Sequence, residues 1–317
     1  MPQPKKETRD LTTSGPSGEE IRFPVGWVRG GEEGPSLAVV AGVHGSEYDG
    51  IEAAKRLFAW VEPSALRGTL VVVPCLNVPA FYGLAMHVNP IDGENPARCF
   101  PGDPNGSYTE RMVDLLWREV ITGSDAVVDV HGGDLEEELV SYSQINLTGD
   151  ESVDRTAEGV ALALDLPFFV RREAPASPPT KDGTICQLAG PIGIPAALAE
   201  AGSHGVLDPE CVAEHLKGLK NVLSYLDMID QPAIIEHEQP VLLHRFVGVA
   251  ASVSGMWYPS VRKGDVIQPG QSLGVVKDFF GHEREVVVSD ENAVVLGVMT
   301  VLARGEGDML MGLGTLD

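Results

Sequence analysis

Short hydrophobic runs alternate with amphipathic stretches through the first two thirds of the chain. Residues 37–42, 69–74 and 125–130 are mostly apolar and rich in valine, which is typical of strands covered on both faces. Hydrophobic residues recur at helical spacing over 51–61, and a long helix is predicted over 209–229. Strands that alternate with helices predict an α/β fold with a mainly parallel or mixed sheet flanked by helices.

The pattern changes near residue 236. Residues 241–317 show no helical period, and short β-type runs alternate there with glycine-containing turns. This spacing predicts a small all-β domain of the barrel-sandwich type. We therefore predict a flexible polar arm at residues 1–20, an α/β domain over 21–236 and a β-rich C-terminal domain over 237–317.

The net charge of the chain argues against nucleic acids and anionic membranes as partners. The 317 residues include 46 acidic and 23 basic side chains, a formal net charge of −23, which repels nucleic acids and anionic membrane surfaces. No apolar run reaches the roughly 20 residues of a membrane-spanning helix, and no apolar signal segment follows the N-terminus. The four cysteines lie far apart with no CxxC pair, which favours reduced thiols and argues against a cysteine zinc site. We expect a cytoplasmic protein with a small-molecule substrate, no nucleic-acid partner and no membrane partner.

Candidate chemistry gathers where the predicted strands end. His44 and Glu47 follow the run 37–42, and His131 follows the run 125–130. Two histidines and a carboxylate are a common zinc ligand set in hydrolases, and they leave one position open for water. Either histidine alone is more simply explained as a polar residue that ends a strand. Both together, each after a buried strand and beside glycine, predict one Zn²⁺ per chain bound by His44, Glu47 and His131.

A zinc hydrolase also needs a base that takes a proton from water. Glu200 ends the apolar run 194–199, and partial burial there would raise its pKa toward the working pH. From spacing alone, an acid at the start of a helix or a solvated loop residue explains Glu200 equally well.

A family resemblance rests on motifs that occur in a fixed order. These are Gly42-Val43-His44-Gly45-Ser46-Glu47, Asp92-Gly93 followed by Arg98-Cys99-Phe100-Pro101-Gly102, Asp129-Val130-His131, and Glu200-Ala201-Gly202. The ordered set resembles the succinylglutamate desuccinylase/aspartoacylase family, a branch of the zinc carboxypeptidase-like proteins, across most of residues 20–317. The resemblance implies a zinc amidohydrolase that removes an acyl group from a small N-acylated amino acid or related amide. It also implies that residues 21–236 are the catalytic domain, that His44, Glu47 and His131 bind zinc, and that Glu200 is the base.

The resemblance implies that Arg98 holds a substrate carboxylate. A guanidinium can bind a carboxylate through two parallel hydrogen bonds; the alternative is that Arg98 belongs to a surface ion pair. Two positions depart from the family pattern: Ala97 stands where an asparagine is usual, and Met86 stands where many members carry an arginine that polarises the scissile carbonyl. His87 is one residue away. The departures leave the substrate open between an anionic N-acyl amino acid, a less anionic amide and an ester.

Two other functions stay open at this point. A metallocarboxypeptidase acting on short peptides would need a pocket for the terminal carboxylate, and a non-catalytic zinc-fold binding protein would fit Met86 and Ala97. The C-terminal domain looks like a biotinyl or lipoyl carrier, but its candidate hairpin at 289–293 has no lysine. We therefore expect it to form a wall of the site or a homo-oligomer contact. The run Glu136–Glu138 is predicted to be a solvated face.

Overall fold

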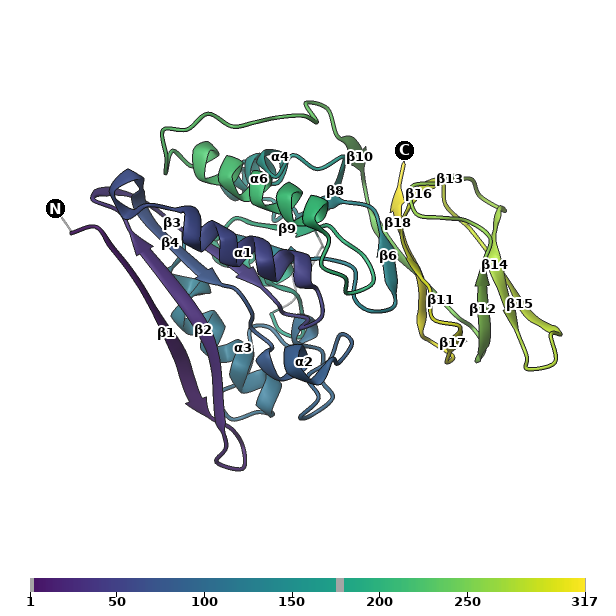
Figure 1. Ribbon diagram of the computed structural model, residues 1–317. Helices are drawn as coiled ribbons and strands as arrows, with labels where there is room; N and C mark the ends of the chain where they lie inside the picture. The colour runs from purple at the N-terminus through teal and green to yellow at the C-terminus, as the bar shows by residue number, and fades with distance from the viewer. Residues whose placement is uncertain (1–2, 175–179, 317) are drawn as a thin grey trace.

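The computed structural model describes residues 3–174 and 180–316, and its largest element is a nine-stranded sheet (Figure 1). The strands lie in the order β1 (Lys5–Ser14), β2 (Glu20–Arg29), β4 (Arg67–Val73), β3 (Glu32–Ala41), β5 (Ala126–His131), β9 (Ala196–Glu200), β7 (Tyr142–Asn146), β8 (Phe168–Arg172) and β10 (Val241–Leu243). The pairs β4–β3, β3–β5 and β5–β9 are parallel, whereas β1–β2, β2–β4 and β9–β7 are antiparallel. The prediction of an α/β fold with a mixed sheet is confirmed.

Helices cover both faces of this sheet (Figure 1). One face packs against α1 (Tyr48–Trp60), α4 (Glu151–Ala163) and α6 (Pro209–Tyr225), and the other against α3 (Tyr108–Glu119) and α5 (Ile185–Ala189). The shorter elements are α2 (Val78–Gly83) and the 3-10 turns η1 (Pro63–Ala65), η2 (Pro96–Arg98), η3 (Ile121–Gly123) and η4 (Gly190–Ile192). Helix α6 ends at Tyr225 rather than at residue 229, and Asp227 just beyond takes a left-handed backbone conformation with φ 55°.

Burial on both faces explains why the central strands are apolar without alternation. In β3, Leu37 and Val39 pack in the hydrophobic cluster that includes α1, whereas Ala38 and Val40 pack in the cluster that includes α3. Successive side chains of a strand point to opposite faces, so both sets must be apolar. In β5 and β9 the polar side chains, which are Asp129, His131 and Glu200, lie toward the carboxyl ends of the strands.

The N-terminal residues form an edge strand, so the prediction of a flexible arm is wrong for Lys5–Ser14. The whole of β1 pairs with β2 in an antiparallel ladder. Its side chains are polar because most of them face solvent, although Leu11 is buried and the Arg9 guanidinium lies 4.7 Å from the centre of the Trp27 ring. The strand could not be recognised from its polar composition, because its hydrogen bonds are made with the backbone groups of β2 and do not require apolar side chains in β1.

Antiparallel strands make up the C-terminal region, in agreement with the predicted β-rich part. One sheet contains β11 (Phe246–Ala250), β18 (Met309–Thr315), β16 (Ala293–Met299), β13 (Val266–Ile267) and β6 (Glu137–Leu139). The other contains β15 (Glu283–Val288), β14 (Ser272–Lys277), β12 (Gly255–Pro259) and β17 (Ala303–Arg304). The assignment to the barrel-sandwich type stays a prediction.

Two strands cross the predicted domain boundary. Strand β6, which follows β5 closely, pairs with β16 of the C-terminal region, while β10 pairs with β8 of the large sheet. The division into 21–236 and 237–317 stays a prediction. The exchange places the segment just after His131 directly against the C-terminal strands.

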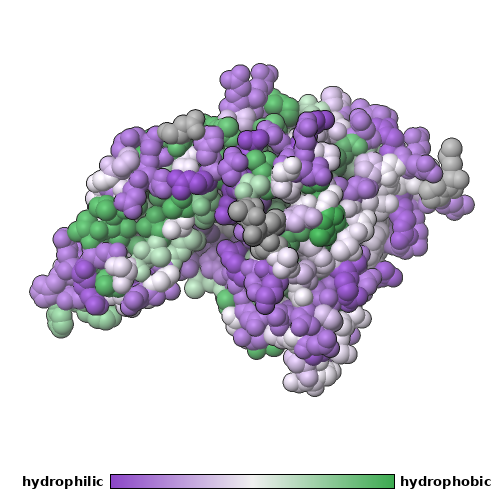
Figure 2. All heavy atoms as spheres, turned by 180° about the vertical axis from the view of Figure 1, so that it is seen from behind, coloured by the Kyte–Doolittle hydropathy of each residue, from purple (hydrophilic) through white to green (hydrophobic). Residues whose placement is uncertain are grey.

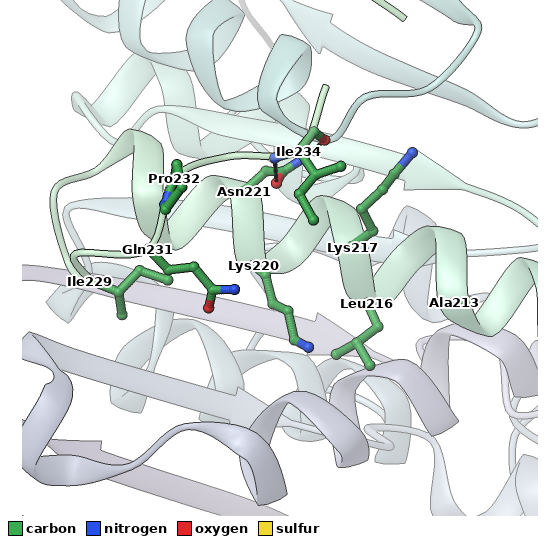
Figure 3. Close-up of a pocket in the computed structure, with 9 residues that line it drawn as sticks. All are labelled: Ala213, Leu216, Lys217, Lys220, Asn221, Ile229, Gln231, Pro232 and Ile234. Carbon is green, nitrogen blue, oxygen red and sulfur yellow. Dashed lines mark hydrogen bonds between the residues drawn. The ribbon is translucent and has the colours of Figure 1, made fainter. Parts of the chain in front are cut away.

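The segment that connects the two regions is held along α6 beside a pocket (Figure 3). The Asn221 side chain donates a hydrogen bond to the Ile234 carbonyl and accepts one from the Ile234 amide, each at 2.8 Å. The Lys217 ammonium lies 2.7 Å from the Asp165 carboxylate and 2.6 Å from that of Glu236. These contacts fix the start of the C-terminal region relative to the sheet.

Hydrophobic residues gather on the lobe formed by the C-terminal sheets, as Figure 2 shows. Exposed large side chains of these sheets include Val266, Val286 and Val288. The homo-oligomer contact expected of this region stays a prediction. Among the residues described, no helix combines the length and the apolar character needed to cross a membrane.

Candidate active site

His44 and Glu47 lie in the turn between β3 and α1. Gly42 turns the chain with φ +63°, and a Cβ there would lie 2.8 Å from the Cα of Cys75, so the turn requires glycine. Nδ1 of His44 lies 2.6 Å from Oε1 of Glu47. The turn therefore directs the imidazole and the carboxylate at one another, as their spacing predicted.

His131 reaches the same place from β5. Because β3 and β5 are parallel neighbours, their carboxyl ends meet at one edge of the sheet. Nδ1 of His131 lies 2.9 Å from Oε2 of Glu47. One donor atom from each of His44, Glu47 and His131 lies within 4.8 Å of the others, so this cluster could hold a metal ion.

The charges of the cluster are strongly coupled. Burial disfavours the charged form of Glu47, but the positive charges of His44 and His131 outweigh it and lower the pKa of this carboxyl. Burial likewise opposes the charge on His131, yet the carboxylates of Asp129 and Glu47 raise its pKa well above the usual range. A bound cation would replace the imidazole protons, because ligands bind metals as carboxylate and neutral imidazole.

Asn95 and Asp129 contact the outer nitrogens of the two histidines. Nε2 of His44 lies 3.1 Å from Oδ1 of Asn95, and Nε2 of His131 lies 3.1 Å from Oδ1 of Asp129. Oxygen acceptors at these positions favour a proton on each Nε2 and leave each Nδ1 free for a metal. The sequence reasoning missed both residues, although Asp129 could have been found, since it stands two residues before His131 on the same face of β5.

Glu200 ends β9 opposite His131 in the parallel ladder between β5 and β9. Burial raises the pKa of its carboxyl well above the usual range; Glu47 and Glu137 add to this effect, and His131 opposes it. Within residues 3–174 and 180–316, its side chain forms no hydrogen bond or ion pair. A partly buried carboxyl without a partner, next to the cluster, is suited to proton transfer.

Arg98 lies in η2, downstream of Asn95. Its side chain is exposed, and Nη1 donates a hydrogen bond to the carbonyl oxygen of Ala97 at 3.0 Å. Burial lowers the pKa of Arg172, and the positive charge of Arg98 adds to this effect, so the two guanidinium groups lie near one another. The structure leaves the Arg98 side chain free of ion pairs among the described residues, and its role as a carboxylate ligand stays a prediction.

His87 lies against the cluster and was noted from sequence only as a neighbour of Met86. Its ring meets that of His44 edge to face, with 5.2 Å between centroids. Its amide donates to Oδ2 of Asp134 at 2.7 Å, and its Nδ1 lies 3.2 Å from the same oxygen. Burial and the charge of His44 lower the pKa of His87. Met86 itself is 40% exposed, and its thioether has no hydrogen-bond donor.

The run Glu136–Glu138 is not the solvated face that the sequence predicts. The Glu136 side chain is 13 % exposed, and its Oε2 lies 2.9 Å from Nη2 of Arg304, on β17. Residues 137–139 form β6 and pair with β16. The prediction is wrong because these acidic residues contact β16 and β17, which come much later in the chain. A local sequence pattern cannot indicate such long-range contacts.

The sequence model of one protein family, the succinylglutamate desuccinylase/aspartoacylase catalytic domain, matches residues 33–226 of this chain. An N-alpha-acetyl-L-2,4-diaminobutyric acid deacetylase from Halomonas elongata is 28% identical over 261 residues, covering 81% of this chain and 75% of that protein.

Solved structures show the same fold. A succinylglutamate desuccinylase from Silicibacter sp. TM1040 superposes with a TM-score of 0.84 at 22% identity, covering 99% of this chain and 95% of that one. The product-bound ectoine utilization protein from Ruegeria pomeroyi gives a TM-score of 0.84 at 22% identity, with coverage of 99% and 95%. His44, Glu47, His131 and Glu200 all lie within the range 33–226 that the family model matches.

Proposed function

This chain belongs to the succinylglutamate desuccinylase/aspartoacylase family, and on that premise we propose that it is a zinc-dependent hydrolase that removes the acyl group from a small N-acylated amino acid or a related amide. The observation that carries the proposal is the cluster of His44, Glu47 and His131, whose donor atoms lie within 4.8 Å of one another beside the carboxyl of Glu200, which has no hydrogen-bond or ion-pair partner among the described residues. The printed name of the Halomonas relative describes a reaction of this class.

Two imidazoles and one carboxylate fit zinc, and they leave room for further ligands. When bound, zinc supplies Lewis acidity and makes water a nucleophile at neutral pH. The chain's own residues would then complete the reaction. Glu200 takes a proton from the attacking water and passes it to the departing nitrogen as the amide C–N bond breaks. Asn95 and Asp129 keep the two histidines in the tautomer that presents Nδ1.

We assign catalysis to residues 21–236, with the C-terminal region as one wall of the site. The support is the pairing of β6 with β16 and the contact between Glu136 and Arg304. The zinc carboxypeptidase-like relationship belongs to the same proposal.

Metal analysis joined to a substrate screen tests this function. We expect about one zinc per chain and hydrolysis of at least one N-acetyl or N-succinyl amino acid, including N-α-acetyl-2,4-diaminobutyrate. Release of C-terminal residues from short peptides alone would indicate a carboxypeptidase. A zinc-loaded protein that cleaves no amide and no ester would indicate a binding protein and contradict the proposal.

Replacing Arg98 by methionine should raise KM for substrates that carry a carboxylate. The loss of a hydrogen bond to a charged group costs about 1.5 to 3 kcal/mol, so KM should rise about 10- to 100-fold while kcat changes little. Steady-state kinetics on a carboxylate substrate and on its amidated form measure the effect, which should be confined to the carboxylate. Arg118→Met is the matched control, because the Arg118 side chain on α3 is 50% exposed. An unchanged KM for Arg98→Met would remove Arg98 from the substrate site.

A further inference from the structure

We propose that the open edge of β1 pairs with the same edge of a second copy of the chain, so that the two large sheets join in a dimer. Strand β1 is the first strand of the nine-stranded sheet, and within residues 3–174 and 180–316 only β2 pairs with it (Figure 1). The backbone N–H and C=O groups on the free side of an edge strand can bind a further strand.

The backbone of β1 is suited to such pairing. Its register with β2 runs from Lys5 opposite Arg29 to Ser14 opposite Glu20 without a bulge, and no proline interrupts its ten residues. Proteins commonly protect edge strands by short length, by a bulge, by proline or by charged side chains, and β1 has only the last of these. The arrangement of its charges therefore decides whether a second copy can pair with it.

Two-fold symmetry limits the possible registers. A two-fold axis perpendicular to the sheet makes the two edge strands antiparallel. In an antiparallel pair, two residues that lie opposite each other direct their backbone groups the same way, and this direction alternates along each strand. Residues that face each other across the axis are therefore both even or both odd in number. The axis must then pass beside one residue of β1 and its own copy.

The charges of β1 favour one position for this axis. Beside Glu7, Arg9 or Asp10, the axis would place two like charges directly opposite each other. Beside Thr8, residues 5–11 of both copies overlap, Lys6 lies opposite the partner's Asp10, and Glu7 lies opposite the partner's Arg9. Symmetry repeats each pair, which gives two pairs of opposite charge on each face of the joined sheet. Opposite charges across a strand pair are stabilising, and like charges are destabilising.

The side chains involved are accessible. Arg9 and Asp10 are exposed, and neither forms an ion pair within the described part of the chain. The charge of the strand also helps, because β1 has three basic and two acidic side chains whereas the whole chain has a net charge of −23. Repulsion between two copies is therefore reduced along this edge.

Two charge reversals test the pairing. In Asp10→Lys, each Lys6 faces an introduced lysine; in Lys6→Asp, each Asp10 faces an introduced aspartate. We expect the wild type to form a dimer, and each variant alone to have a dimer dissociation constant at least about tenfold higher. Sedimentation velocity over a range of protein concentrations measures this constant. Lys6→Asp also removes a hydrogen bond from Nζ to the Ala59 carbonyl, whereas Asp10 has no such contact, so Asp10→Lys is the variant less disturbed in its own fold.

An equal mixture of the two variants gives the sharper result. In a mixed dimer, Lys6 of one chain faces Asp10 of the other, and the introduced lysine faces the introduced aspartate. All four pairs again have opposite charges, so the mixture should form dimers with about the wild-type dissociation constant. Restoration in the mixture requires that residues 6 and 10 of different chains lie opposite each other, as the axis at Thr8 places them.

The control applies the same reversals to an exposed pair away from β1. The side chains of Lys181 and Asp182 are 79% and 67% exposed, so Lys181→Asp and Asp182→Lys should leave the dimer unchanged. Circular dichroism identifies any variant that has not folded.

Three results would overturn the inference: a wild type that stays monomeric at every concentration, a dimer that neither reversal weakens, or single variants whose mixture stays dissociated. Amide cleavage plays no part in these measurements, so the inference is tested independently of the proposed function.

Discussion

Glutamine in place of Glu200 is expected to lower kcat by about 10²- to 10⁴-fold while the protein keeps its zinc. The amide has nearly the shape of the carboxylate but cannot take a proton from water. Glu200 lies at the end of β9, where its backbone is fixed by pairing with β5 and β7, so the substitution should leave the strand ends in place. The amide substrate that the wild type hydrolyses fastest provides the measurement, with zinc content determined on the same samples.

Glu119→Gln provides the control for this substitution. Glu119 is the last residue of α3 and its side chain is 45% exposed, so the same change of charge should leave kcat unaltered there. A Glu200→Gln protein that keeps more than about a tenth of wild-type kcat would show that another group takes the proton, since a lost general base costs more than this.

The local pattern of hydrophobic residues was sufficient to predict the strands at the centre of the large sheet. Strands β3 and β5 have apolar side chains on both faces; β5 ends at His131, and His44 follows the end of β3 by three residues. These two features together predicted both the parallel sheet and the edge at which His44 and His131 meet. The helix after Glu47 was also predictable, because α1 buries one face and exposes the other.

The pattern of hydrophobic and polar residues did not predict the strands that are stabilised by contacts with distant segments of the chain. Strand β7 has the sequence YSQIN, which lacks a strong apolar run, and it is a strand because β9 and β8 pair with it on either side. Strand β1 was missed for a similar reason. In both cases the backbone of a neighbouring strand supplies hydrogen-bond partners, and these partners cannot be recognised from the local sequence.

The same limit applies to the site. His44, Glu47 and His131 follow recognisable strand ends, so their types and positions were sufficient to bring them together in a hypothesis. His87 lies in a loop with φ +51°, and its surroundings depend on Asp134 and on Glu136, which in turn contacts Arg304 near the end of the chain. Only the folded arrangement of β6, β16 and β17 brings these groups to the cluster of His44, Glu47 and His131.

Alanine in place of His131 is expected to reduce bound zinc from about one equivalent per chain to below about a tenth. The substitution removes one of three donors and leaves the buried carboxylates of Glu47 and Asp129 without their shared partner. Two remaining donors, His44 and Glu47, cannot hold a tetrahedral ion against water at low metal concentration. Elemental analysis after dialysis against metal-free buffer measures the loss.

Thermal unfolding with and without a chelator measures the loss of bound zinc in His131→Ala independently. A ligand that binds only the folded state at 100 times its Kd stabilises that state by about 2.7 kcal/mol, so chelation should lower the Tm of the wild type but not that of His131→Ala. His282→Ala is the control, because the His282 side chain is 78% exposed and its Nδ1 lies 2.9 Å from Asp278, away from the cluster. This control should keep its zinc and its response to the chelator. Zinc retained at one equivalent by His131→Ala would mean that the metal binds elsewhere, and Glu200 would then lose its place beside the reacting water.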